Sequence, residues 1–167
     1  MKLKDMLEGP IVEALRLLPE RMNSTEAKVM LLAIGLQESR FEHRRQLVGS
    51  PPKPVGPAKS FWQGEQGGGM VAGLLRFHDS RVRDIATALC AIRGVSPNTQ
   101  SVWNAIEHDD VLAAGLARLL LWTDPKPLPA IGEVDGAWNL YARVWRPGKP
   151  HPQTWARFYA QALEAVA

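Results

Sequence analysis

The residue best suited to chemistry is Glu38, because its carboxyl group interrupts the apolar pattern of a predicted helix. Glu38 follows Ile34 and Leu31 at helical spacing, so the three side chains lie on one face of that helix. Burial on this face and the negative end of the helix dipole both raise the pKa of Glu38. A carboxyl group that stays protonated near neutral pH is what general-acid cleavage of a glycosidic bond requires. A second interpretation ends the apolar face at Ile34 and leaves Glu38 in solvent.

The residues around Glu38 resemble the lysozyme superfamily, and above all its lytic transglycosylases and the related phage muralytic proteins. Segment 33–41 reads AIGLQESRF, which is similar to the family's pattern of a buried helix followed by Glu-Ser-x-Phe. The resemblance implies a lysozyme-like helical fold and the role of catalytic acid for Glu38. Ser39, which follows the acid, is expected to hydrogen-bond the substrate or Glu38, although its position also suits an ordinary helix end.

A second part of the resemblance lies in segment 61–69, which reads FWQGEQGGG. The family lines its sugar cleft with a glycine-led segment that ends in Leu-Met-Gln, and phage-type members are similar to the Phe-Trp-Gln, acid and glycine run seen here. The resemblance implies that Trp62 and Gln63 contact sugar. Trp62 is expected in a loop, where an exposed indole stacks on a pyranose ring.

The third part of the resemblance is the sequence Ala137-Trp138-Asn139, which is similar to the family's Ala-Tyr-Asn box on a helix that faces the acid. Here Trp138 replaces the tyrosine, and the glycine that the family has after the asparagine is missing. Tyr141 lies one helical turn after Ala137 and offers a hydroxyl group instead. Asn139 and Tyr141 are therefore both candidates for the sugar contact.

A hydrolase needs a second carboxylate across the scissile bond, and the sequence offers two. Glu65 lies in the glycine-rich segment, where the phage-type resemblance places an acid, and is the first candidate. Glu42 is the second, because it follows Glu38 by one helical turn. Glu65 also suits a solvated loop position or a role in orienting Gln63. With no second carboxylate, the 6-hydroxyl of the sugar attacks and a 1,6-anhydro product forms, as in the transglycosylase branch.

Other chemistries lack support in this sequence. The four histidines are dispersed and form no local metal-binding motif, and Cys90 is the only cysteine. No glycine-flanked serine marks a hydrolase triad, and no Lys-Ser/Thr follows the glycine run as a phosphate loop would need. We expect neither a metal nor a cofactor.

The elements that must position these residues are mostly helices. One domain over 1–167 is expected, with a long Gly/Pro-rich cleft loop over 42–70. Pro10 is expected to interrupt the first helix, and Pro19 to end it. Helices are expected over 3–18, 24–40, 71–77, 81–92, 99–107, 110–122, 133–145 and 152–166.

Composition and charge limit the classes of partner that this protein is expected to bind. The chain has 167 residues and a formal net charge of +3, too small an excess for a typical nucleic-acid-binding protein. We expect no stable membrane insertion and no signal peptide, and we expect a monomer made in the host cytoplasm. Its expected partner is the glycan strand of peptidoglycan, which it would reach as a phage lysis enzyme. The alternatives are a virion-associated muralytic protein and a non-catalytic glycan-binding or structural protein of the same fold.

Overall fold

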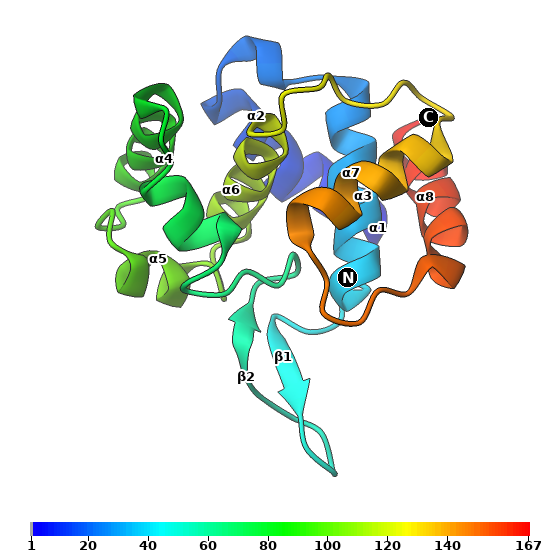
Figure 1. The fold of residues 1–167 in the computed structure, drawn as a ribbon, viewed down its shortest axis with the longest axis horizontal. Helices are drawn as coiled ribbons and strands as arrows, with labels where there is room; N and C mark the ends of the chain where they lie inside the picture. The colour runs from blue at the N-terminus through cyan, green and yellow to red at the C-terminus, as the bar shows by residue number, and fades with distance from the viewer. Residues whose placement is uncertain (1) are drawn as a thin grey trace.

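The computed structural model describes residues 2–167, and these form a mostly helical fold with one small antiparallel sheet (Figure 1). The strands are β1 (Arg45–Val48) and β2 (Lys53–Lys59). The helices are α1 (Leu3–Met6), α2 (Val12–Leu17), α3 (Thr25–Ser39), α4 (Ser80–Ile92), α5 (Thr99–Ala105), α6 (Asp110–Trp122), α7 (Val134–Trp145) and α8 (Pro152–Val166).

The expected interruption of the first helix by Pro10 is confirmed. A π-helical turn, Leu7–Ile11, contains Pro10 and joins α1 directly to α2. Proline lacks a backbone N–H and crowds the preceding turn, and the wider π-helical turn accommodates both effects. A second π-helical turn, Gly69–Gly73, begins at the last residue of the glycine run.

Helix α3 is the central element of the fold. Ser24 caps its first turn by accepting a hydrogen bond from the Ala27 N–H at 3.1 Å, as the sequence predicts. Residues 29–36 are all buried, so the helix is enclosed on every side, whereas the sequence pattern suggested a single apolar face. Its end is sharp, because Arg40 adopts a left-handed conformation with φ of 55°. The sharp end directs the chain into the hairpin.

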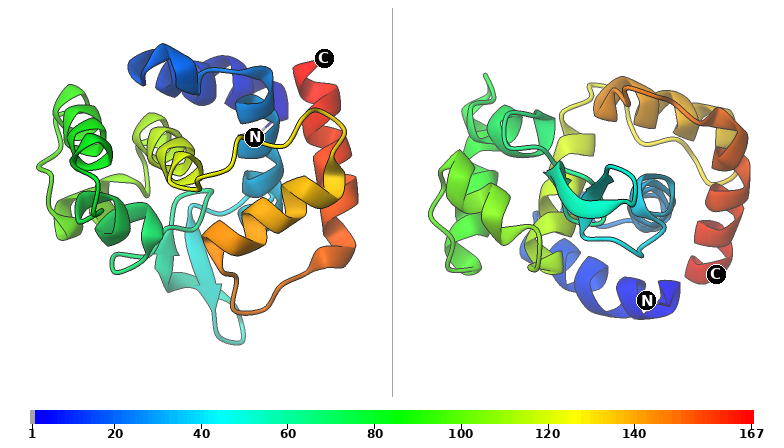
Figure 2. Two further views of the ribbon diagram at one scale, coloured as in Figure 1. Left: turned by 45° about the horizontal axis from the view of Figure 1, so that its top comes forward. Right: turned by 90° about the horizontal axis from the view of Figure 1, so that it is seen from below.

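The other helices pack around α3. Helix α6 is buried along its length and contacts α2, α3 and α4, and helix α8 packs along the opposite side of α3. Seen from below, α3 and the hairpin lie near the middle and the remaining helices surround them (Figure 2). The C-terminal end of α3 and that of α7 approach each other beside the base of the hairpin (Figure 1).

The expectation of one long loop over 42–70 is wrong in part, because this segment contains the β1–β2 hairpin. Leu47 pairs with Pro54 and Val48 with Lys53, and the register shifts between Arg45 and Leu47. Prolines lack the N–H that a central strand needs, so the sequence argued against a sheet. A two-stranded hairpin leaves each strand one free edge, where proline is tolerated.

Candidate active site

The centre of the site is a hydrogen bond between helices α3 and α7. The hydroxyl group of Tyr141 donates to Glu38 Oε1 at 2.6 Å. The ring of Tyr141 is fixed by Trp155 of α8, which stacks on it with the ring centroids 5.2 Å apart and the planes 11° apart. The expected alternative, in which Tyr141 supplies the hydroxyl group, therefore agrees with this geometry.

The surroundings of Glu38 favour its protonated form. Burial raises the pKa of Glu38 to about 7, although the hydrogen bond from Tyr141 acts in the opposite direction. Burial and the neighbouring carboxylate raise the pKa of Tyr141, so the phenol keeps its proton and remains a donor. Glu38 therefore exchanges its proton close to neutral pH, where a general acid is most useful.

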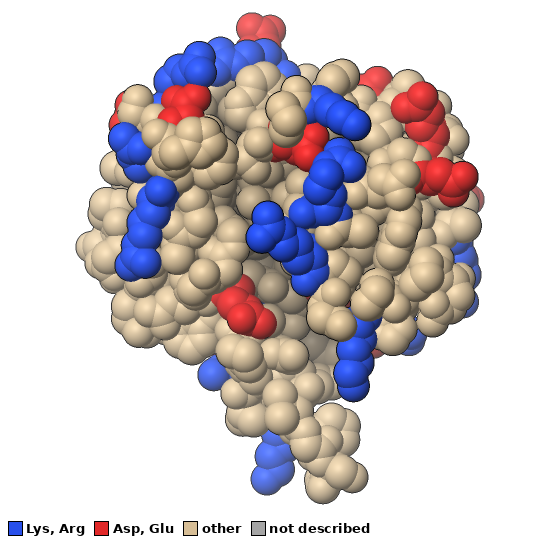
Figure 3. Space-filling view, in the orientation of Figure 1, with Lys and Arg blue, Asp and Glu red and all other residues tan. Residues whose placement is uncertain are grey.

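Glu38 lines a cavity of about 300 Å³ together with Gln63, Glu65, Tyr141 and Trp145. A cavity of about 470 Å³ adjoins it on the hairpin side and shares Glu38 and Gln63. On the other side, cavities of about 200 Å³ and about 590 Å³ follow in turn. The shared lining residues join these spaces into one groove, and Figure 3 shows this face hollowed beside the C-terminal end of α7. We call this groove the cleft.

Gln63 and Glu65 reach the cleft from the segment after the hairpin. Gln63 adopts a left-handed conformation with φ of 54°, and its side-chain amide donates to the Ser60 carbonyl at 2.7 Å. Glu65 is exposed and lines the same cavity as Glu38. The structure thus brings both predicted carboxylates and Gln63 to one cavity. Glu42 lies in the adjoining cavity on the hairpin side.

The expectation that Trp62 exposes its indole to sugar is wrong. Trp62 is 0% exposed, and its indole N–H donates to the Leu31 carbonyl at 2.9 Å. The ring of Phe41 packs against it edge to face. Trp62 therefore anchors the segment after the hairpin to the central helix, and a sugar cannot stack on it in this arrangement.

Ser39 agrees with its second interpretation as a helix-end residue and also lines the hairpin-side cavity, whereas Asn139 does not reach the cavities of the acid. The hydroxyl group of Ser39 donates to the Phe61 carbonyl at 2.8 Å and to the Gly35 carbonyl at 3.2 Å, so it ties the end of α3 to the segment before Gln63. Asn139 is exposed on α7 and does not line the cavities that contain Glu38. Tyr141, and not Asn139, is the side chain that faces the acid.

Trp145 is the aromatic residue of the cleft that sequence reasoning missed. It is half-buried and lines three of the four joined cavities, and its indole N–H donates to the Trp62 carbonyl at 3.0 Å. Ala137, Tyr141 and Trp145 are spaced four residues apart on α7 and therefore share one helix face. This spacing was the signal that could have identified Trp145 once Tyr141 was a candidate.

The positive residues near the site are partly neutralised. The guanidinium of Arg44 pairs with Asp110 and lies over the Phe61 ring, and buried Lys59 pairs with Glu107 at 3.0 Å. These two ion pairs stabilise the base of the hairpin. Arg146 is exposed and lines the cleft next to Trp145.

Within residues 2–167, no group of three or more histidine, cysteine, aspartate or glutamate side chains is arranged to hold a metal ion. The same residues contain no helix that is both long and apolar enough to cross a bilayer. Comparison with family models, with curated proteins and with solved structures gave no match to this chain. The functional assignment therefore depends on the geometry of the site.

Proposed function

We propose that this protein is a glycosidase of lysozyme-like fold that cleaves the β-1,4 bond between N-acetylmuramic acid and N-acetylglucosamine in peptidoglycan. The observation that carries the proposal is the position of Glu38. It lies in the last turn of a helix whose residues 29–36 are all buried, has a pKa raised to about 7, and opens into a cleft with a second carboxylate. A buried acid paired with a carboxylate in a cleft is the arrangement that glycoside hydrolysis uses.

In this proposal Glu38 gives its proton to the glycosidic oxygen as the bond from that oxygen to the anomeric carbon breaks. The sugar acquires oxocarbenium character, and Glu65, in the same cavity, stabilises that charge or orients a water molecule. Water then adds to the anomeric carbon and returns a proton to Glu38. In the transglycosylase route, the 6-hydroxyl of the same sugar adds instead, and the product is the 1,6-anhydro sugar.

The order of elements supports a lysozyme-like fold. The acid ends the central helix, a small antiparallel hairpin follows, and later helices close the opposite side of the cleft. The extended groove on both sides of Glu38 suits a polymer better than a small molecule. The proposed biological role is lysis of a bacterial host by a phage enzyme, acting on the cell wall after release from the cytoplasm.

The test is digestion of purified peptidoglycan by the wild type, Glu38→Gln and Glu164→Gln. Glu164 is exposed on α8 and serves as the matched control. We expect soluble muropeptides from the wild type and the control, and a loss of about a thousandfold or more in rate for Glu38→Gln, since an essential proton donor is removed. A wild type that releases no muropeptides would contradict the enzyme proposal and favour a non-catalytic glycan-binding protein.

The products distinguish the two routes. Mass spectrometry of the muropeptides shows a reducing end after hydrolysis and an anhydro end, lighter by one water molecule, after transglycosylation. Glu65→Gln adds a second criterion. If Glu65 positions water, this substitution suppresses hydrolysis strongly, whereas an anhydro-forming enzyme tolerates it far better.

A further inference from the structure

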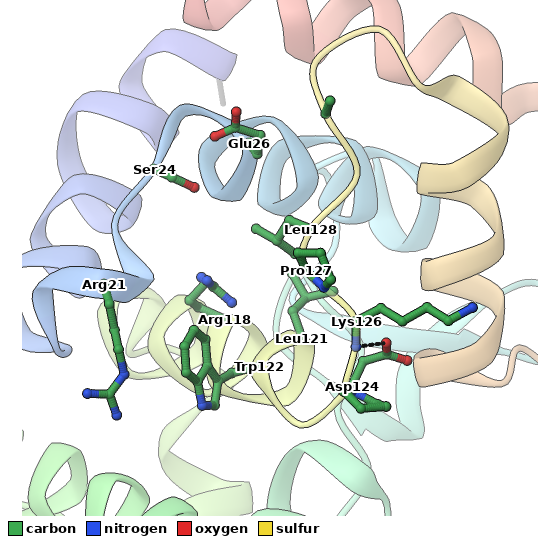
Figure 4. A pocket seen from close by; sticks show the side chains of 12 residues that line it. Arg21, Ser24, Glu26, Arg118, Leu121, Trp122, Asp124, Lys126, Pro127 and Leu128 are labelled. Carbon is green, nitrogen blue, oxygen red and sulfur yellow. Dashed lines mark hydrogen bonds between the residues drawn. The ribbon is translucent and has the colours of Figure 1, made fainter.

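A further cavity of about 600 Å³ lies at the N-terminal end of α3, at the opposite end of that helix from Glu38, and shares only Asp124 and Pro125 with the far end of the cleft. Figure 4 shows that α6, the turn before α3 and the connector after α6 form its walls. None of the cleft residues Glu38, Gln63, Glu65, Tyr141 and Trp145 lines it. Its lining has an apolar part, formed mainly by Leu121, Trp122 and Leu128, and a charged part. The charged residues are Arg21, Glu26, Arg118, Asp124 and Lys126.

The unusual residue of this cavity is Arg118, the charged residue that interrupts the apolar sequence of α6. Its side chain is 2% exposed, and its Nε donates to the Met22 carbonyl at 2.8 Å. Its Nη1 is buried and has no hydrogen-bond partner within the described chain. Burial lowers the pKa of Arg118 to about 10, so the group is still charged at neutral pH. A buried cation with an unsatisfied donor is unfavourable unless an acceptor approaches it.

The charges around Arg118 do not supply that acceptor. Two acids line the cavity, Glu26 and Asp124. Asp124 pairs with Arg143 at 2.6 Å, and no ion pair within residues 2–167 joins Glu26 to Arg118. The side chains of Glu26 and Arg118 lie on different walls of the cavity (Figure 4).

A second cation strengthens the positive character of the cavity. The guanidinium carbons of Arg21 and Arg118 lie 5.2 Å and 5.7 Å from the centroid of the Trp122 ring. The exposed Lys126 adds a third positive group at the cavity. The cavity lies at the N-terminal end of α3, where the first backbone N–H groups point out of the helix and the helix dipole is positive. The cavity therefore favours an anion.

We propose that this cavity binds an organic carboxylate with an apolar body, with the carboxylate paired to Arg118. A guanidinium presents parallel N–H donors that match a carboxylate, and the buried setting strengthens the pair. The walls formed by Leu121, Trp122 and Leu128 would cover an apolar body. An inorganic anion would leave these walls in contact with water. The proposal is independent of the activity proposed for the cleft.

The test is calorimetric titration of the whole chain with benzoate and with N-acetyl-leucine, and with benzyl alcohol as the neutral analogue. We expect saturable binding of at least one carboxylate and no saturation with the alcohol. Arg118→Met should weaken the binding about tenfold or more, because a hydrogen-bonded charge pair is lost. Glu26→Gln should strengthen it by about two- to fivefold, because a like charge is removed. Stronger binding of benzoate indicates a free small acid, and stronger binding of N-acetyl-leucine indicates the carboxyl end of a peptide.

Arg157→Met is the matched control, because Arg157 is exposed on α8 and does not line the cavity. It should bind both carboxylates as the wild type does. If Arg118→Met does not fold, as judged by circular dichroism, the tighter binding of Glu26→Gln decides the question. The proposal is wrong if the wild type binds neither carboxylate saturably, or if a folded Arg118→Met binds them as tightly as the wild type.

Discussion

The hydroxyl group of Tyr141 lies 2.6 Å from Glu38 Oε1 and is the hydrogen-bond donor to that carboxylate. The two residues are far apart in sequence and come from different helices, α3 and α7. The bond favours the ionised form of Glu38, whereas burial favours the protonated form, and burial has the larger effect. The balance between these two opposing effects sets the pKa of Glu38. Loss of the hydrogen bond raises this pKa, and greater exposure to solvent lowers it.

Tyr141→Phe removes the effect that lowers the pKa of Glu38. The pKa of Glu38 should therefore rise above its present value of about 7. The alkaline limb of the pH–rate profile on peptidoglycan should move to higher pH, because Glu38 stays protonated longer. At its optimum the rate should fall roughly tenfold, since the carboxylate left after proton transfer loses a donor. A limb that moves to lower pH would contradict this role for Tyr141.

The pH dependence of stability provides a test that needs no substrate. The pKa of Glu38 is raised from 4.5 to about 7 in the folded chain, so the folded state binds more protons than the unfolded state between these values. This group's contribution to the free energy of unfolding should therefore fall as pH rises from about 4.5 to about 7, and then stay constant. The loss should be on the order of 3 kcal/mol.

Urea unfolding of the wild type and Glu38→Gln at pH 4.5 and pH 8 measures this loss. Glutamine is neutral at both values, so the variant should lack this part of the pH dependence and gain stability relative to the wild type at pH 8. Equal pH dependence in the two proteins would show that Glu38 is not buried as the structure describes.

Two tryptophans should respond differently to substitution. Trp62→Phe removes the indole donor to the buried Leu31 carbonyl and should reduce the free energy of unfolding by about 1–3 kcal/mol. Trp145→Phe changes a half-buried wall of the cleft and should raise KM on peptidoglycan more than it reduces stability. Thermal unfolding and initial rates on both variants separate the effects. A Trp62→Phe variant with wild-type stability would refute the anchoring role of Trp62.

Sequence reasoning predicted the elements that have local signals. The apolar pattern placed α6 at Asp110–Trp122, and Pro152 at a first helical position placed the start of α8, where the structure has them. The hairpin was missed because its second strand contains Pro54 and Pro57, which are unfavourable in most strands.

At the site, Glu38 and Tyr141 could be found because each lies at helical spacing from an identifiable neighbour. The position of Trp62 could not, because its burial depends on contacts with Leu31 and Phe41, which are distant in sequence. The approach of Trp145 to the cleft depends in the same way on how α7 packs beside α3. Local patterns predict which residues share a helix face, and tertiary packing decides what that face contacts.

Substitution of Gly35, which lies one helical turn before Glu38, would test how closely the end of α3 is packed against Phe41. A Cβ atom at this position would overlap the ring of Phe41. Glycine to alanine in a helix interior is normally stabilising by about 1 kcal/mol, but here the rigid ring would have to move. Gly35→Ala should therefore reduce the free energy of unfolding by about 1–3 kcal/mol. It should also reduce activity, because Phe41 packs on Trp62 and Phe61, which precede Gln63 in the cleft.

Gly9→Ala is the matched control, because a Cβ atom at Gly9 would meet nothing within 4 Å. That variant should keep its activity and should be at least as stable as the wild type in urea. If Gly35→Ala were also neutral or stabilising, Phe41 would have room to move. The close packing that links the end of α3 to the cleft segment would then not control the position of Gln63.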